Sequence, residues 1–357
     1  PNRDGEELLK LDGVDIIVGA SDRTNIVEAV LGSVGRKSYL TASPQTFLDG
    51  APGDAGRFRL TLPHTAYLRI AEGCSRTCAF CTIPQIRGPF RSKPMEMILD
   101  EARELIESGA KELSIIAQDT ACWGRELPEP SNLATLLREL NALDGAVWIR
   151  VLYAYPNLFD RELREVFNEC SKVVPYVDMP LQHISTSVLS RMRRNITRDE
   201  IVDTLNDLRE HVNTMVIRTT FITGFPGETQ AEFDELHQFI QEFPFDALGV
   251  FEFSPEEGTL AATMPDQVPL EIARERAERL MATQREIVER TNANSIGRRL
   301  TVLVDGIDEE GYCVGRHYGQ APEIDGVCYF AEPREPGEMV ACEVTDFDGY
   351  DLIVTPK

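Results

Sequence analysis

Between residues 66 and 253, short apolar runs alternate with longer segments in which apolar residues recur every three or four positions. The short runs have the length of buried strands, and the longer ones have the period of amphipathic helices. The expected strands are 66–71, 112–117, 147–152, 173–179, 215–222 and 246–252. Strands joined by helical crossovers pair in parallel, so this α/β pattern predicts either a sheet covered on both faces or an open, partial (β/α)6 barrel.

Two helix starts carry a capping-box signature, in which the side chains of a Thr and a Glu three residues later satisfy free backbone N–H groups. These pairs are Thr197 with Glu200 and Thr229 with Glu232. They predict that helices begin directly after both threonines.

The pattern changes after residue 269. Residues 269–294 read as one long, charged helix. The chain then alternates short apolar runs with Gly, Asp and Glu, and the expected strands are 299–306, 311–317, 326–330, 339–347 and 350–354. This spacing is typical of a small antiparallel all-β barrel. We therefore expect a core domain over 61–294 and a barrel domain over 295–357.

Residues 1–60 are mixed and contain one strand-like run at 15–19 and one helix-like segment at 24–31. Gly and Pro become frequent over 43–56, which indicates a linker. One strand and one helix cannot enclose a core alone. We therefore interpret 1–60 as the remnant of an N-terminal domain followed by a linker.

Composition narrows the class of protein. The 357 residues hold 59 Asp and Glu against 36 Lys and Arg, a net charge of −23. Such a charge repels phosphate backbones and favours basic partners. No apolar run is long enough to cross a membrane, and no signal peptide is evident. Three of the eight cysteines fall within eight residues, which in a chain of this size indicates metal ligation in the reducing cytoplasm.

Cys74, Cys78 and Cys81 have the spacing C-x3-C-x2-C in a loop after the first expected core strand. Three thiolates can hold three irons of a [4Fe–4S] cluster and leave the fourth iron open to S-adenosylmethionine (SAM). Phe80, between the last two cysteines, can shield such a cluster from water. The alternatives are core cysteines or zinc, which prefers four ligands in a closed site.

The other five cysteines are scattered, and free cysteine is commonly a buried small hydrophobe. The alternative to buried, unligated cysteines is a second metal site formed by some of these five residues. They are Cys122, Cys170, Cys313, Cys328 and Cys342.

Polar residues end two core strands. Gln118 and Asp119 follow one strand, and Gln182 and His183 follow another. Polar groups at the carboxyl ends of barrel strands are candidates for SAM or substrate contacts, although His183 could equally be structural.

A sharp turn and a group of basic residues are further candidates. The turn over 221–228 contains Gly224, and glycine lets backbone approach a ligand closely. Arg87, Arg91 and Lys93 follow the cysteine loop and could bind a carboxylate or be solvated.

The chain resembles the radical SAM methylthiotransferases, and within them the RimO type. The resemblance lies in YLRIAEGCSRTCAFCTIPQIRGPFRSKP (67–94), SIIAQDT (114–120), VDMPLQHIS (177–185), RTTFITGFPGET (218–229), MPDQVP (264–269) and APEIDG (321–326). It implies a partial TIM-like barrel followed by a small β domain called TRAM. It also implies that the three cysteines bind the cluster, that no residue acts as acid or base, and that SAM contacts come from Phe80, Gln118, Gln182, Arg218, Gly224 and Glu228.

The resemblance further implies a reaction. Enzymes of this type use the cluster to cleave SAM, activate the β-carbon of an aspartate in the twelfth small-subunit ribosomal protein, and add a methylthio group. A flavodoxin or ferredoxin is the usual electron donor. Their sulfur comes from a second [4Fe–4S] cluster held by N-terminal cysteines, but residues 1–73 contain none. We therefore expect this chain alone to bind one cluster and cleave SAM without methylthiolating its substrate.

Two alternatives remain. The tRNA branch of the same family modifies an adenosine, but residues 298–357 hold five basic residues against 13 acidic ones. That balance favours a basic ribosomal protein over nucleic acid. A non-enzymatic metal-binding scaffold is the other alternative, and it predicts no release of 5′-deoxyadenosine.

Overall fold

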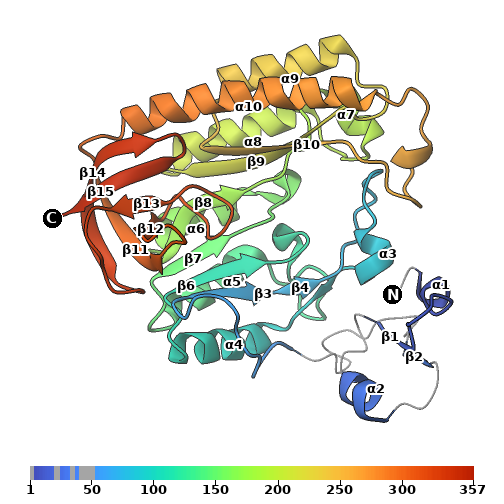
Figure 1. Cartoon of the computed structure of the whole chain (residues 1–357), viewed down its shortest axis with the longest axis horizontal. Helices are drawn as coiled ribbons and strands as arrows, with labels where there is room; N and C mark the ends of the chain where they lie inside the picture. The colour runs from blue at the N-terminus through green and yellow to red at the C-terminus, as the bar shows by residue number, and fades with distance from the viewer. Residues whose placement is uncertain (1–3, 20–24, 33–36, 40–52) are drawn as a thin grey trace.

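A six-stranded, all-parallel sheet forms the centre of the molecule (Figure 1). The computed structural model describes residues 4–19, 25–32, 37–39 and 53–357. The sheet order is β10-β9-β8-β7-β6-β3. Its strands are β3 (Thr65–Arg69), β6 (Glu112–Ile116), β7 (Trp148–Val151), β8 (Val173–Asp178), β9 (Val216–Thr223) and β10 (Ala247–Glu252). All six lie where the apolar runs predict them.

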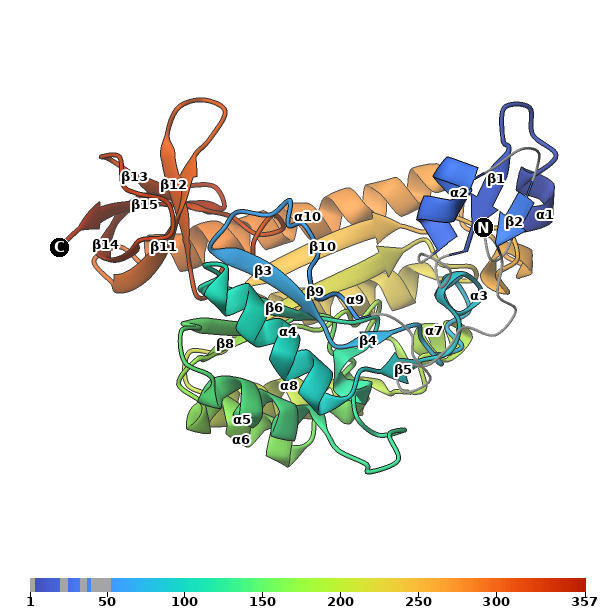
Figure 2. The ribbon, with the colours of Figure 1, turned by 90° about the horizontal axis from the view of Figure 1, so that it is seen from below.

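Helices follow the strands and cover one side of the sheet (Figure 2). Each has an apolar stripe that packs on the sheet, as in α4, where Ile98, Ala102 and Leu105 are buried. Strands β3 and β10 are the two edges of the sheet and do not pair with each other or with another described strand on their outer sides, so the barrel is open, as predicted. The main helices are α4 (Met95–Glu107), α5 (Leu133–Ala142), α6 (Arg161–Glu169), α8 (Arg198–His211), α9 (Gln230–Glu242) and α10 (Leu270–Ala293).

Both predicted capping boxes are present. Thr197 caps α8 and Thr229 caps α9, and in each case the side chain accepts from the backbone N–H of the glutamate three residues later. The glutamate side chain in turn accepts from the threonine N–H. Helix α10 begins after Pro269 and ends at Asn294, as the pattern predicts.

The C-terminal strands form a closed five-stranded barrel in the order β11-β12-β13-β15-β14. One pairing differs from the expected all-antiparallel barrel, because β13 and β15 run parallel. The reason is parity, since five strands that alternate in direction cannot close without one parallel pair. The strands are β11 (Arg299–Ile307), β12 (Cys313–His317), β13 (Cys328–Phe330), β14 (Met339–Asp348) and β15 (Asp351–Pro356).

The closed barrel packs against the amino ends of the sheet strands through buried ion pairs. Glu112 at the start of β6 accepts from Arg150 of β7 at 2.8 Å and from Arg316 of β12 at 2.6 Å. Arg316 also pairs with Asp305 at 2.7 Å. This network leaves the carboxyl ends of the strands open at the opposite edge.

The N-terminal segment lies at the end of the molecule far from the closed barrel (Figures 1 and 2). It contains α1 (Gly5–Leu8), β1 (Ile16–Val18), α2 (Ile26–Gly32) and β2 (Lys37–Tyr39), with β1 and β2 paired in parallel. Most of the predicted linker, residues 43–52, and residue 24 lie outside the described residues. No helix in the described part of the chain is long and apolar enough to cross a membrane.

Candidate active site

The three predicted ligand cysteines converge on one cavity of about 520 Å³ at the carboxyl ends of the sheet strands. The segments that follow β3, β6, β7 and β8 all contribute to its wall, as parallel strands of a barrel require. The lining residues are Arg69, Cys74, Arg76, Cys78, Phe80, Cys81, Ile83, Ile116, Ala117, Gln118, Asp119, Tyr153, Ala154, Tyr155, Pro180, Gln182, Arg194, Thr220 and Phe251.

The cysteine loop is held by backbone contacts at both ends. Gly73 has φ +78°, and a Cβ there would lie 2.2 Å from the carbonyl oxygen of Pro89. Only glycine lets the loop approach that closely. The Cys74 N–H then donates to the carbonyl of Gly88 at 3.1 Å, and the Ala79 N–H donates to that of Met192 at 3.0 Å.

Two of the three thiols receive backbone hydrogen bonds. The Arg76 N–H donates to Cys74 Sγ and the Ile83 N–H to Cys81 Sγ, both at 3.4 Å. Burial raises the pKa of both thiols, and the neighbouring cysteines raise it further. Binding of a metal would offset this unfavourable effect of burial, because a metal stabilises the thiolate form. The backbone N–H···S bonds would stabilise the ligated sulfur as well.

A [4Fe–4S] cluster and a single zinc ion make different demands on the spacing of three thiols. Among the described residues, no group of three or more His, Cys, Asp or Glu side chains is close enough to share one metal ion. A tetrahedral zinc site, with Zn–S bonds of about 2.3 Å, would draw its sulfurs to within about 4 Å of one another. A [4Fe–4S] cubane binds each thiolate to a different iron, so its sulfurs lie farther apart.

Arg76, Tyr155 and Arg194 form a stack in the cavity wall that the sequence did not indicate. The guanidinium carbons of Arg76 and Arg194 lie 3.7 and 4.0 Å from the centroid of the Tyr155 ring, which is cation–π geometry. Arg76 pairs with Asp119 at 2.8 Å. Arg194 lies 4.0 Å from Cys78 Sγ. Nothing in their sequence spacing brings these side chains together.

Three of the predicted SAM contacts line the cavity. They are Phe80, Gln118 and Gln182. Gln182 has φ +72°, a left-handed conformation that is uncommon for a residue with a side chain and recurs at functional sites. Its backbone is fixed there by N–H and carbonyl bonds to strand β9 at 2.8 Å each.

The other three predicted contacts lie outside the cavity lining. Arg218 pairs with Asp178 at 2.8 Å and with Asp325 of the C-terminal barrel domain at 3.4 Å, near the amino end of β9. A Cβ on Gly224 would meet Ala273 of α10 at 2.3 Å, so this glycine serves helix packing. Glu228 accepts from the Phe225 N–H at 3.1 Å, and burial raises its pKa to about 7.

His183 and Lys93 also lie outside the cavity lining. His183 is fully buried, accepts from the Ser185 N–H at 3.0 Å, and has its pKa lowered by burial to about 3. Lys93 is also fully buried and pairs with Asp54 and Glu101, so it is neither solvated nor a cavity cation.

Arg87 and Arg91 also lie outside the cavity lining. Arg87 lies 3.5 Å from Glu72, and Arg91 is buried and donates to two backbone carbonyls.

The remaining cysteines do not gather. The Cys122 Sγ–H donates to Asp119 at 3.1 Å, and the combination of burial and this carboxylate raises its pKa to about 12. Cys170 packs in the core of the sheet domain. Cys313, Cys328 and Cys342 pack inside the C-terminal barrel, as small hydrophobes do.

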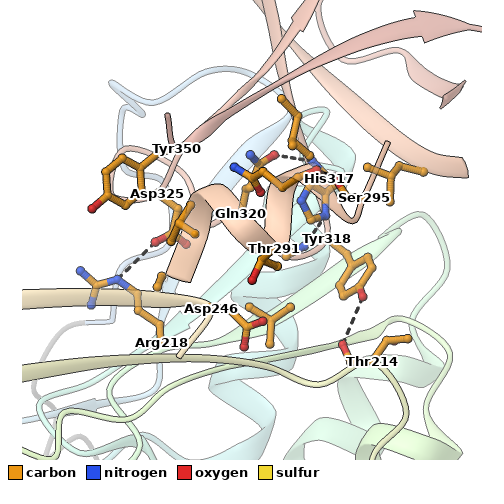
Figure 3. Close-up of a pocket in the computed structure, with 18 of the residues that line it drawn as sticks. Thr214, Arg218, Asp246, Thr291, Ser295, His317, Tyr318, Gln320, Asp325 and Tyr350 are labelled. Carbon is orange, nitrogen blue, oxygen red and sulfur yellow. Dashed lines mark hydrogen bonds and ion pairs between the residues drawn. The ribbon is translucent and has the colours of Figure 1, made fainter. Parts of the chain in front are cut away.

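A second cavity, of about 580 Å³, lies between the amino ends of β9 and β10 and the C-terminal barrel domain. Figure 3 shows Arg218 reaching Asp325 across it and Tyr318 donating to the Thr214 carbonyl. None of the three clustered cysteines lines it. Its polar groups mainly bind one another, so we interpret it as part of the interface between the sheet domain and the C-terminal barrel.

Comparison with known proteins agrees with this geometry. Residues 68–240 match the Radical SAM superfamily and residues 296–356 match the TRAM domain. The ribosomal protein uS12 methylthiotransferase RimO of Clostridium tetani is 44% identical over 356 residues, which cover 98% of this chain and 79% of that protein. The enzyme of the same name from Geobacter sulfurreducens is 42% identical over 367 residues, covering 99% and 80%.

A solved structure, the radical SAM enzyme coproporphyrinogen III oxidase from Escherichia coli, aligns with a TM-score of 0.45 and 15% identity, covering 80% of this chain and 67% of that one.

The similarity to the two RimO proteins extends across both matched domains and nearly the whole chain. Membership of the radical SAM superfamily implies a [4Fe–4S] cluster and SAM as cofactors. The chain therefore belongs to the RimO family of radical SAM methylthiotransferases.

Proposed function

We propose that Cys74, Cys78 and Cys81 hold a [4Fe–4S] cluster and that SAM binds beside it in the same cavity. The observation that carries this proposal is the convergence of three thiols on a cavity whose lining also includes Gln118 and Gln182 at strand ends. When bound, the cluster and SAM supply one-electron chemistry that breaks an unactivated carbon–hydrogen bond.

The protein's own task is to bind, orient and exclude water. Phe80 lines the cavity, and its ring packs edge-on against the buried Phe225 with ring centroids 6.5 Å apart. The amides of Gln118 and Gln182 offer both donors and acceptors to the polar groups of SAM. Burial lowers the pKa of His183 to about 3, so its imidazole is neutral at pH 7, and it lies outside the cavity lining.

The proposed substrate is the aspartate of ribosomal protein uS12, and the product carries a methylthio group on its β-carbon. The support is the name shared by the relatives, which cover this chain from end to end. A ribosomal protein as substrate makes the cytoplasm the site of the reaction. A flavodoxin or ferredoxin is the proposed electron donor.

The charge of the C-terminal barrel supports a protein substrate over tRNA. Of its few basic side chains, Arg316 is buried against Glu112, and Lys357 pairs with Glu343 at 2.9 Å. A further one, Arg334, lies 3.7 Å from Glu332. These three of the five basic residues in 298–357 therefore already face carboxylates, which leaves few cations for the phosphate contacts on which RNA binding depends.

We also propose that residues 61–294 form the radical SAM domain, that 295–357 form the TRAM domain, and that 1–60 belong to an N-terminal methylthiotransferase domain. In this arrangement a second cluster, which donates sulfur, is held by cysteines that residues 1–73 do not contain. These 357 residues then bind one cluster and cleave SAM, but do not methylthiolate uS12.

Anaerobic reconstitution tests these proposals. We expect about four iron and four sulfide per chain, and 5′-deoxyadenosine after reduction with SAM. Cys78→Ala should abolish both. Cys122→Ala is the matched control, because Cys122 lies close to Asp119 but outside the cavity lining, and it should retain both. Eight iron per chain, or equal loss in the two variants, would contradict the proposal.

A further inference from the structure

Arg194 is a buried cation without an acidic partner among the described residues. Its side chain comes from the segment after α7 (Thr186–Arg191), and the residue is only 6% exposed. One guanidinium nitrogen donates to the Pro180 carbonyl at 2.5 Å, and Nε has no partner in the described structure. No carboxylate of a described residue lies within ion-pair distance, in contrast to Arg150, which is fully buried against Glu112 at 2.8 Å.

A buried charge without a counter-ion is costly, and an anion at its side normally offsets that cost. Stacking on Tyr155 and one carbonyl contact recover only part of the lost hydration. The position of Arg194 therefore indicates that an anion occupies the cavity it lines.

The other charged groups in the cavity wall compensate one another. Arg69 lies 2.9 Å from Asp54 and also pairs with Glu72. Arg76 lies 2.8 Å from Asp119. Arg194 is left as the uncompensated charge among the described lining residues, and one of its guanidinium nitrogens lies 4.0 Å from Cys78 Sγ.

We propose that Arg194 is the fixed counter-charge of the cluster bound at Cys74, Cys78 and Cys81 and that it raises the reduction potential of that cluster. The inference rests on the proposed cluster site. A doubly positive [4Fe–4S] core with three thiolates has one net negative charge, and one-electron reduction adds a second. A buried cation at this distance stabilises the reduced form more than the oxidised form, because the local dielectric screens weakly. Arg194 is thus a positioning and tuning residue and needs no contact with the substrate.

The test is a redox titration of the reconstituted chain, followed by electron paramagnetic resonance. Arg194→Gln should lower the equilibrium constant for reduction of the cluster at least tenfold. For a one-electron couple this makes the reduction potential more negative by at least about 59 mV. Arg194→Lys keeps the charge and should recover at least half of that shift. Arg193→Gln is the matched control, since Arg193 is exposed and water screens its charge, and it should leave the potential unchanged.

A second measurement separates tuning from a merely structural role. The counter-charge role predicts that Arg194→Gln lowers the thermal stability of the cluster-loaded chain more than that of the metal-free chain. Equal losses in the two forms, or an unchanged potential in Arg194→Gln, would overturn the inference. If Arg194→Gln assembles no cluster while Arg194→Lys does, the charge is required and the inference holds. Failure of both variants to assemble overturns it, whereas failure of the wild-type chain to assemble a cluster refutes the proposed function itself.

Discussion

Arg316 of barrel strand β12 donates to the carboxylate of Glu112 in β6 at 2.6 Å, and both side chains are buried. The two residues are 204 positions apart in the sequence, yet Glu112 binds Arg150 at the same time. Burial alone would raise the pKa of Glu112, but the two arginines outweigh it and hold that pKa below its usual value. The pair joins the closed barrel to the amino ends of the sheet strands.

Replacing Arg316 should therefore destabilise the chain strongly. Arg316→Met removes one of the two arginines that pair with Glu112, and it also removes the arginine that pairs with Asp305. Breaking buried ion pairs in this way costs about 3–5 kcal/mol. Urea unfolding followed by circular dichroism measures the change. Arg299→Met, at an exposed position of the same barrel, should cost less than about 0.5 kcal/mol. Similar losses in the two variants would argue against the network.

Lys93 should be equally sensitive, although it lies next to the cysteine loop in the sequence. It is fully buried between Asp54 and Glu101, so Lys93→Met leaves Glu101 without its cation, removes one of the cations at Asp54 and should cost about 3–5 kcal/mol. The double variant Lys93→Met, Glu101→Leu should recover part of the loss, because Asp54 still pairs with Arg69. Thermal unfolding of the three chains provides the comparison. A double variant no more stable than the single one would count against this account.

Gly224 is constrained both by its backbone and by its surroundings. Its φ is +74°, which costs a residue with a side chain about 1–2 kcal/mol, and a Cβ would clash with Ala273, which costs about 1–3 kcal/mol more. Gly297 has φ +84° but open space around it. We therefore expect Gly224→Ala to lower the free energy of unfolding by more than Gly297→Ala does. Denaturant unfolding of both variants measures the difference. Equal losses of stability would show that the contact with Ala273 contributes nothing.

Glu232 should contribute stability that depends on pH. Burial would raise its pKa, but hydrogen bonds from Arg191 and Thr229 outweigh that effect and lower it from 4.5 to about 2. A lowered carboxyl pKa gives stability that is full above pH 4.5 and is lost as the pH falls towards 2. Glu232→Gln should therefore be less stable than wild type at pH 7, by about 1 kcal/mol for the lost cap interactions, and should approach it near pH 2.

Glu200 provides the matched comparison for Glu232. It occupies the same position in the capping box of α8, but it is exposed and no arginine pairs with it in the described structure. Glu200→Gln should therefore show a smaller pH-dependent change. Thermal melts of both variants between pH 2 and pH 7 make the comparison, and a larger effect at Glu200 would contradict it.

Much of the fold follows from short-range patterns. The strands, the capping boxes and the single helix from Leu270 to Ala293 depend on residues within a few positions of one another, so the sequence indicates them directly. The candidate site is partly predictable for the same reason. Gln118 and Gln182 end parallel strands and so meet at one edge, where the cysteine loop also lies.

Other assignments required the tertiary structure. Arg218 looked like a SAM contact because it begins a motif, yet it lies near the amino end of β9 and pairs with Asp325, more than 100 positions later. The sequence allows Lys93 either to bind the carboxylate of a ligand or to be solvated, whereas in the structure it pairs with Asp54, which lies in a segment that reads as a linker. Arg194 carries no signal of its own, since its meaning depends on the absence of a carboxylate around it in the described structure.

The sequence by itself determined the order of strands and helices and the chemistry that three closely spaced thiols can perform, because periodicity, capping and ligand spacing are local properties of the chain. Only the tertiary structure decided which charged side chains are buried together and that Arg194 lies beside the thiols without a carboxylate partner among the described residues. The physical reason is that the energy of a charge depends on its surroundings in space, and those surroundings come from segments far apart in the chain.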